Sequence, residues 1–356
     1  MLFGSQYKSL IGLDITPSSI KLVELSSAGK GYRAECYAAE PTPPNSINER
    51  TIVDAPAVGE AIRRAVKRAG TTTKHVAIAI SSDATILRRI PLERTRSPRE
   101  LEAKVEASMG QVIPFQIEEV SYDFELLGPS AGDPEMDEVL LVATRRENVD
   151  QRAQAVQNAG LIPEVVDVEQ YAVENACRLM AHQMPDGGVG RSVAIVDFGA
   201  STTTFSVLKD LSIAYTRDFP FGGQQLTEEI MRTYGLSLEE AGRAKKEGGL
   251  PGNYQPEVLD PFVDDMTQQV SRSLQFYLAS AQGSDQPDQI LVCGGCANIP
   301  GVADVIASKV GIPTDVGDPF GDMKISTRAK TQGIRRDATA LLTALGLALR
   351  SFDRSR

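Results

Sequence analysis

The sequence predicts an α/β fold of two similar lobes, with a small α+β subdomain inserted into the first lobe. Strand-like runs alternate with helical periods along most of the chain. A short pattern around an aspartate occurs twice, at Asp14 and at Asp197, and each copy lies between two strand-like runs. Because a repeated sequence pattern indicates a repeated structural unit, we expect one copy in each lobe.

Each copy of the pattern follows its aspartate with a tight turn of small and hydroxyl residues. The hydroxyl residues four and five positions after the aspartate are Ser18 and Ser19 in the first copy and Ser201 and Thr202 in the second. Such turns leave backbone N–H and side-chain O–H groups that point the same way and bind anions, and the carboxylate can hold Mg²⁺, usually through water. These residues are also common in ordinary hairpin turns, but their repetition favours two phosphate clamps around one Mg-triphosphate.

The composition indicates a globular protein and argues against a general nucleic-acid binder. The 356 residues are 42% hydrophobic and carry a formal net charge of -10, whereas a nucleic-acid binder needs a basic face to displace counterions. The chain lacks an apolar run of about eighteen residues, and residues 1–8 lack the apolar region of a signal peptide. We therefore expect a cytoplasmic protein. Four cysteines do not make a disulfide scaffold in a chain of this length.

The order of the predicted elements divides the chain into two lobes and an insertion. A hairpin over 9–25, a helix over 58–69 and a strand over 75–80 give a βαβ-like beginning. The pattern then changes to strand, helix, strand, strand, helix, which is typical of a small α+β unit. The expected division is 1–82, 164–190 and 336–356 for the first lobe, 83–163 for the inserted subdomain, and 191–335 for the second lobe.

The order of the motifs resembles that of the actin, heat-shock chaperone and hexokinase superfamily of nucleotide-binding proteins. Two aspartate hairpins with an inserted domain between them, a helix with a lysine, and a strand that runs into Gly294-Gly295 follow one another over nearly the whole chain. The position of the insertion is similar to that in the cell-division protein FtsA. The fuller resemblance is to the PilM family of type IV pilus assembly proteins. The segments that carry it are 12–15, 19–25, 113–115, 139–145, 271–277 and 345–350.

The resemblance implies an actin-like (ribonuclease H-like) fold and a site for ATP or ADP with Mg²⁺. The residues that match the first phosphate element are Gly12, Asp14, Ser18, Ser19 and Lys21, and those that match the second are Asp197, Gly199, Ala200, Ser201, Thr202 and Thr203. The residues that match the adenosine element are Gly294, Gly295 and Asn298, and Lys245 matches the lysine of a ribose and adenine helix. Asp14 and Asp197 are the expected Mg²⁺ ligands, through water.

Three further positions bear on affinity and hydrolysis. Gly242 stands where the superfamily often has a ribose-binding glutamate, so that hydrogen bond is either missing or supplied from elsewhere. Pro17 has no N–H and removes one donor from the first turn. Glu169 resembles the acidic residue that helps to place the attacking water in the chaperone branch, and the alternative is a polar residue at a helix start. We expect modest nucleotide affinity and slow or no intrinsic ATPase activity.

The PilM resemblance also implies partners and a location. It implies a cytoplasmic scaffold for pilus biogenesis and twitching motility, held at the inner membrane through its partners. A groove between the inserted subdomain and the first lobe would bind the N-terminal cytoplasmic peptide of PilN, as a strand added to a sheet edge. The pilus motor ATPases are further expected partners, and the sequence leaves the oligomeric state open.

Other interpretations of the same residues remain. A small-molecule (sugar-type) kinase or a filament-forming ATPase of the same superfamily would share the two clamps, although the recognised motifs contain no convincing catalytic aspartate for a kinase. Cys293 and Cys296 form a Cys-x-x-Cys pair after a strand, which makes a redox site an alternative, whereas zinc would need a second pair of ligands. The P-loop motif is absent. The acidic positions Glu118, Glu119, Asp123 and Glu125 predict a solvated face, with a basic partner peptide as the alternative.

Overall fold

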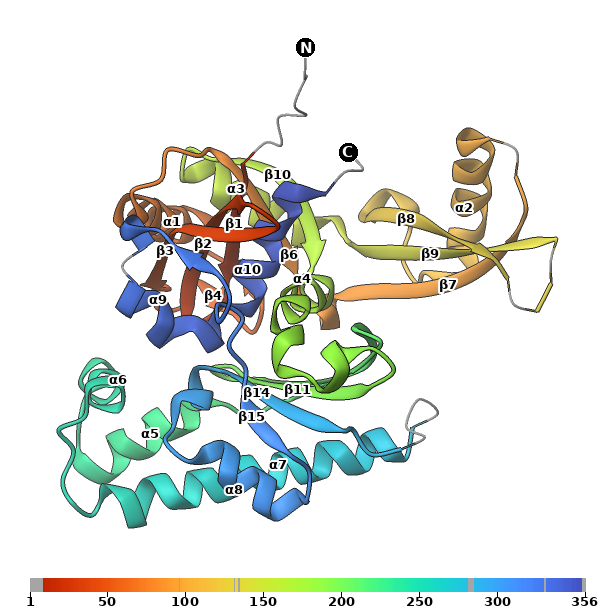
Figure 1. Cartoon of the computed structure of the whole chain (residues 1–356). Helices are drawn as coiled ribbons and strands as arrows, with labels where there is room; N and C mark the ends of the chain where they lie inside the picture. The colour runs from red at the N-terminus through yellow and green to blue at the C-terminus, as the bar shows by residue number, and fades with distance from the viewer. Residues whose placement is uncertain are drawn as a thin grey trace.

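The computed structural model describes residues 9–95, 97–130, 132–133, 135–280, 285–329 and 331–353. It confirms the predicted α/β class, because two mixed sheets form two lobes and a separate three-stranded sheet stands beside them (Figure 1). In Figure 1 the first lobe lies above the second, and the three-stranded sheet projects to the right.

The two lobes repeat one strand order. The first sheet runs β3-β2-β1-β6-β10 with β16 outside β3, and the second runs β13-β12-β11-β14-β15. In both, the first three strands are antiparallel neighbours, and the other two run parallel to the third. The bounds are β1 Ile11–Ile15, β2 Ser19–Ala28, β3 Gly31–Pro41, β6 His75–Ile80, β10 Ile162–Val168 and β16 Lys324–Ile325 in the first sheet, and β11 Ser192–Phe198, β12 Thr203–Lys209, β13 Ser212–Phe219, β14 Gln289–Gly294 and β15 Thr314–Val316 in the second. The repeated hairpins, β1–β2 and β11–β12, thus occupy equivalent places.

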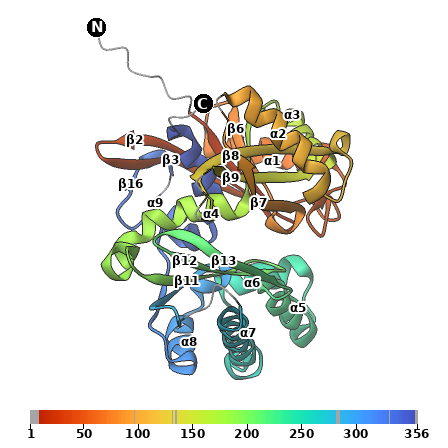
Figure 2. The same cartoon turned by 90° about the vertical axis from the view of Figure 1, so that its right-hand side faces the viewer.

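Helices cover both faces of the first sheet and separate it from the second. One face is covered by α1 (Ala55–Ala69) and α3 (Arg146–Asn158), and the other by α4 (Glu169–Cys177), α9 (Thr331–Asp337) and α10 (Leu342–Leu349). In the second lobe α5 (Gly223–Tyr234), α7 (Asp260–Leu278) and α8 (Val302–Val310) pack on the outer face. Figure 2 shows α4 between the two sheets. Among the described residues, no helix is both long enough and apolar enough to cross a bilayer.

Local sequence signals set several helix ends. The Asp54 carboxylate accepts a hydrogen bond from the Ala57 N–H at the start of α1, and Gly70 ends that helix in the left-handed conformation. At the start of α2 (Pro98–Val112), the Ser97 hydroxyl accepts a hydrogen bond from the Glu100 N–H. A full capping box begins α6 (Leu238–Glu247). These helix starts are therefore encoded by residues next to them in the chain.

The inserted subdomain lies between β6 and β10 and has a core of its own. Its sheet has the order β7-β9-β8, with α2 packed on one face through Leu101, Val105 and Met109. The strand bounds are β7 Thr85–Glu93, β8 Val120–Pro129 and β9 Met136–Arg145. The expected boundary at residue 163 differs from the structure, because α3 starts directly after β9 and buries Ala155 and Val156 in the core of the first lobe. Helical periodicity shows that α3 has an apolar face but not which core that face enters.

The return of the chain to the first lobe also differs from the expected boundary at 335/336. Strand β16 pairs with Arg33 and Ala34 of β3, so the chain rejoins the first sheet at Lys324. The following helix, α9, contributes Ile334 to the same core as α10. A two-residue strand carries too little periodicity to be recognised from sequence.

Two glycines let α10 touch its neighbours backbone to backbone. A Cβ atom added to Gly346 would overlap the Ala172 carbonyl oxygen of α4. One added to Gly12 of β1 would overlap the Ala344 carbonyl oxygen of α10. Since a real side chain cannot occupy space that a backbone atom already fills, β1, α10 and α4 are held at a spacing that only glycine permits at these positions.

Gly346→Ala should therefore destabilise the protein. We expect a loss of about 3 kcal/mol or more in the free energy of unfolding, because α10 would have to move away from α4. Gly242→Ala is the matched control: it lies within α6 with open space around it, and we expect a gain of up to about 1 kcal/mol from helix propensity. Urea unfolding followed by circular dichroism measures both, and equal effects of the two substitutions would contradict the packing argument.

Candidate functional site

The two aspartate hairpins approach α4 from opposite sides. Side chains alternate along a strand, so Asp14 shares the face of β1 on which Gly12 meets α10. Asp197 shares the face of β11 that carries Val193 and Ile195, which pack with α4 residues. Both carboxylates therefore point into the space between the lobes, where Glu169 begins α4.

Lys21 links the groups of this space electrostatically. Its ammonium lies 2.9 Å from the Asp14 carboxylate, which is 7% exposed. Burial alone would lower the pKa of Lys21, but the Asp14 carboxylate, and then Asp197 and Glu169, raise it above its ordinary value. Acidic groups of the first hairpin, the second hairpin and the start of α4 thus act on one cation.

The two acidic groups opposite Asp14 are harder to ionise than free carboxylic acids. Burial raises the pKa of Asp197 to about 6, and the Lys21 ammonium opposes part of this shift. Burial also raises the pKa of Glu169, against the lowering effect of the Arg50 guanidinium. A divalent cation beside them would favour their charged forms.

The hydroxyl groups of the two turns differ in what they can offer a ligand. Within the described part of the chain, the hydroxyls of Ser19, Ser201 and Thr202 have no hydrogen-bond partner. The Ser18 hydroxyl lies 3.3 Å from that of Thr16. The Thr203 hydroxyl differs from the expectation for a ligand-binding group, because it is buried and donates to the Phe221 carbonyl at 2.8 Å.

The backbone of the second turn is tied to the start of α5. The Gly199 N–H donates to the Thr202 carbonyl at 3.0 Å and closes the turn. The carbonyls of Gly199 and Ala200 accept the N–H groups of Gly223 and Gln224 at 3.0 and 2.8 Å. These bonds hold the turn in a fixed position relative to α5.

The Gly-Gly loop lies directly beside the second hairpin. Asp197 and Phe198 of β11 pair with Cys293 and Gly294 of β14. A Cβ atom on Gly294 would lie 2.5 Å from an Asp197 carboxylate oxygen, so glycine is required there. Gly295 is exposed and has open space around its Cα atom.

Lys245 and Asn298 are placed near this loop but already have protein partners. The Lys245 ammonium donates to the Gly223 carbonyl and the Thr227 hydroxyl, both at 2.7 Å, and burial lowers its pKa. The Asn298 amide donates to the Arg336 carbonyl at 3.1 Å and to the Thr339 hydroxyl at 3.2 Å. Lys245 thus braces α5, and Asn298 joins the second lobe to the segment that precedes α10.

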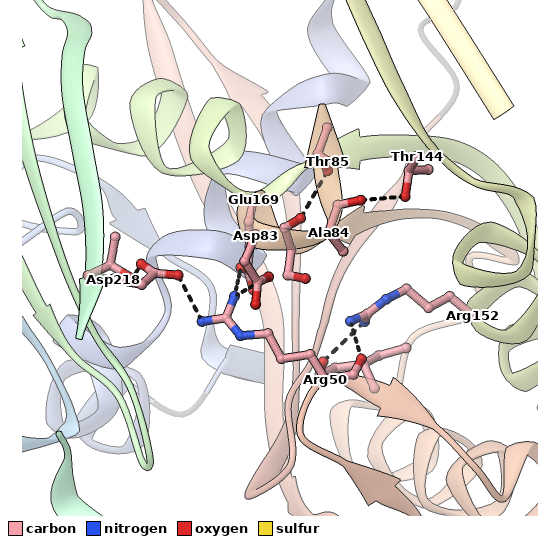
Figure 3. Close-up of polar contacts among 11 residues, drawn as sticks. Arg50, Asp83, Ala84, Thr85, Thr144, Arg152, Glu169 and Asp218 are labelled. Carbon is pink, nitrogen blue, oxygen red and sulfur yellow. Dashed lines mark hydrogen bonds and ion pairs between the residues drawn. The ribbon is translucent and has the colours of Figure 1, made fainter. Parts of the chain in front are cut away.

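Sequence reasoning missed two arginines and two acidic residues of this site, which Figure 3 shows. Arg50, between β4 (Ile47–Asn48) and β5 (Thr51–Ile52), lies 2.8 Å from Glu169 and 3.3 Å from Asp218 of β13. It also lies 3.6 Å from Asp83. Arg152 of α3 donates to the carbonyls of Ile15 and Arg50 at 3.2 and 3.3 Å. No local pattern marks these residues, although the alternation of β13 places Asp218 opposite Thr204, whose hydroxyl donates to it at 2.7 Å.

The site carries an excess of negative charge. Its five carboxylates and three cationic side chains leave an excess of about two negative charges when all are ionised. The groups are Asp14, Asp83, Glu169, Asp197 and Asp218 with Lys21, Arg50 and Arg152. Among the described residues, no three His, Cys, Asp or Glu side chains converge to hold a metal by themselves. A magnesium ion here would take most of its ligands from water and phosphate.

The Cys-x-x-Cys pair does not have the environment of a redox site. Cys293 and Cys296 are both buried and free. Burial raises the pKa of Cys296 to about 11 and raises that of Cys293 as well. Since a reactive dithiol needs a stabilised thiolate, these cysteines are better explained as packing residues of β14 and the following turn.

Comparison with known proteins identifies the family. The model of the type IV pilus assembly protein PilM family matches residues 12–352. The chain belongs to this family. A solved PilM-PilN type IV pilus biogenesis complex is similar over 97% of this chain and 98% of that chain, with a TM-score of 0.78 and 28% identity. The resemblance to the PilM family that the motifs indicated is therefore confirmed.

More distant relatives share the fold. The ethanolamine utilization protein EutJ from Carboxydothermus hydrogenoformans is similar over 96% of this chain and 89% of its own, with a TM-score of 0.55 and 18% identity. The cell division protein FtsA of Bacillus subtilis (strain 168) is 27% identical over 135 residues, which span 31% of this chain and only 30% of FtsA. The expected actin-like fold is confirmed.

The raised pKa of Asp197 makes a prediction about stability. Burial raises the pKa of Asp197 from its ordinary value of 3.8 to about 6 in the folded protein. The buried charge therefore destabilises the folded protein above about pH 6, and protonation removes this destabilisation as the pH falls below that value. Asp197→Asn should raise the melting temperature at pH 7.5 and raise it less at pH 5, in buffer without metal or nucleotide. Asp265→Asn, at an exposed position of α7, should show no such pH dependence. Equal effects of Asp197→Asn at both pH values would contradict the assignment.

Proposed function

We propose that this protein is a nucleotide-binding scaffold of a type IV pilus assembly complex at the cytoplasmic face of the inner membrane. The observation that carries the proposal is the convergence of Asp14, Lys21 and Asp197 from two equivalent hairpins on one space between the lobes. Family membership supports the pilus role. ATP or ADP with Mg²⁺ is the ligand that this donor set fits best.

The charges of the site support a magnesium complex as the ligand. A bare triphosphate would be repelled by the excess of carboxylates, whereas Mg²⁺ would neutralise both partners. Asp14 and Asp197 would hold the ion through water, and the hydroxyls of Ser19, Ser201 and Thr202 would donate to phosphate oxygens. The exposed backbone of Gly295 would lie against the adenosine.

The surroundings of Glu169 support slow or absent hydrolysis. To orient an attacking water, this carboxylate would need an oxygen directed at that water. In the structure one of its two oxygens, Oε2, accepts a hydrogen bond from the Arg50 guanidinium at 2.8 Å. A scaffold that responds to bound nucleotide without rapid turnover is the role that this arrangement supports.

The partner surface that we propose is the open face of the inserted sheet together with β10. On β9 and β7 the side chains of Val142, Leu140 and Leu87 lie on the face opposite α2 and are partly exposed. Tyr171 of α4 lies within electrostatic reach of Arg89 and Glu125 on this sheet. Among the described strands, β10 ends the first sheet, and its Val166 is 39% exposed.

A short extended peptide fits such a surface. Its main chain would pair with the outer edge of β10, and its apolar side chains would contact the open face. A solved PilM-PilN complex is similar to this chain along nearly its whole length. We therefore propose the cytoplasmic N-terminal peptide of PilN as the occupant.

Asp197→Ala should weaken Mg-nucleotide binding by about tenfold or more without unfolding the protein, because it removes a carboxylate that orients metal-bound water. Isothermal titration with Mg-ADP and with a non-hydrolysable ATP analogue measures the affinity, and circular dichroism checks the fold. Asp265→Ala, at an exposed position of α7, is the matched control. An unchanged affinity in folded Asp197→Ala would overturn the proposed nucleotide site.

Val142→Asp should weaken binding of a synthetic PilN N-terminal peptide by about tenfold or more, since it places a charge in an apolar contact. The same variant should keep the wild-type affinity for Mg-nucleotide. Val305→Asp in α8 of the second lobe, where Val305 is 42% exposed, should change neither affinity. Fluorescence anisotropy of a labelled peptide measures the effect, and full peptide affinity in folded Val142→Asp would exclude this surface.

A further inference from the structure

Arg50 lies where three parts of the molecule meet. Its guanidinium contacts Glu169 at the start of α4, Asp218 in the second lobe and Asp83 next to β7 of the inserted subdomain, at 2.8, 3.3 and 3.6 Å (Figure 3). Arg50 itself belongs to the first lobe. One planar cation thus joins the first lobe, the second lobe and the insertion. A guanidinium group suits this role better than an ammonium group, because its N–H donors point in several fixed directions.

The backbone around Arg50 is joined to the phosphate hairpin. Arg152, which is 8% exposed, donates to the carbonyl of Arg50 and to that of Ile15, the last residue of β1. Arg152 stands on α3, which continues directly from β9 of the insertion. The two arginines therefore connect the end of β1 to both the entry and the exit of the inserted subdomain.

The start of β7 and the end of β9 are hydrogen-bonded to the segment that carries Asp83. The Thr144 hydroxyl of β9 donates to the Ala84 carbonyl at 2.7 Å, and the Thr85 hydroxyl donates to the Ser81 carbonyl at 2.9 Å. Asp83 lies between these two contacts in the chain. A shift of Asp83 would thereby be transmitted to β7 and β9 together.

We propose that Arg50 is a positioning residue that couples occupancy of the proposed nucleotide site to peptide binding by the inserted subdomain. This inference rests on the proposed function. Asp218 contacts Arg50 in the structure. Mg-nucleotide held by both hairpins would favour this arrangement of the lobes, in which Arg50 also contacts Glu169 and Asp83. The orientation of the open face relative to β10 then depends on the contacts of Arg50. Binding of either ligand therefore changes the affinity of the protein for the other ligand by the same factor.

The test measures peptide affinity with and without saturating Mg-ADP in the full chain. The wild-type protein should show a change of about fivefold or more, in the range of ordinary coupling. Arg50→Gln should reduce this ratio to about one while both ligands still bind, and Arg50→Lys should restore it only in part. The matched control is Arg232→Gln, whose ion pair with Glu229 lies within α5 at the surface, and it should keep the wild-type ratio.

The outcomes separate the two proposals. A wild-type protein that binds both ligands without coupling, or Arg50→Gln with the wild-type ratio, overturns the role of Arg50 and leaves the proposed function standing. A wild-type protein that binds neither ligand overturns both. If Arg50→Gln fails to fold, Asp218→Ala removes the same contact between the lobes, and an unchanged ratio in that variant overturns the inference.

Discussion

The close contact of β1, α10 and α4 is the constraint on which the rest of the site depends. Gly12 and Gly346 allow backbone contact on the two sides of α10. Asp14 follows Gly12 by two residues on the same face of β1, and Glu169 begins the helix that Gly346 touches. A larger side chain at either glycine would therefore move a carboxylate of the candidate site as well as weaken the core.

The candidate site contains few cationic side chains for its number of carboxylates. The Lys21 ammonium interacts with carboxylates of both hairpins, and the Arg50 guanidinium interacts with the three acidic groups around the start of α4. Buried Arg152 donates to two carbonyl groups. Because burial penalises each charge, removal of one partner leaves others uncompensated. The same cluster that would receive magnesium thus also contains a contact between the lobes, that of Arg50 with Asp218.

Much of the fold could be predicted from sequence because its signals are local. The hairpins at Asp14 and Asp197 are continuous motifs, and the Ser97 cap lies next to its helix. Arg50 and Asp218 are 168 residues apart and meet only through tertiary structure. The core entered by α3 is likewise not encoded in its periodicity. Thr203 matched the phosphate motif, but the pleat of β12 turns its hydroxyl to the Phe221 carbonyl.

The repeated strand order has one more consequence. Two halves with the same topology, β3-β2-β1-β6-β10 and β13-β12-β11-β14-β15, present corresponding hairpins to each other. A ligand held between them meets like elements from both halves, so the molecule offers one shared place rather than two separate ones. The halves differ between the fourth and fifth strands, where the first carries the three-stranded insertion and α3, and the second carries α8.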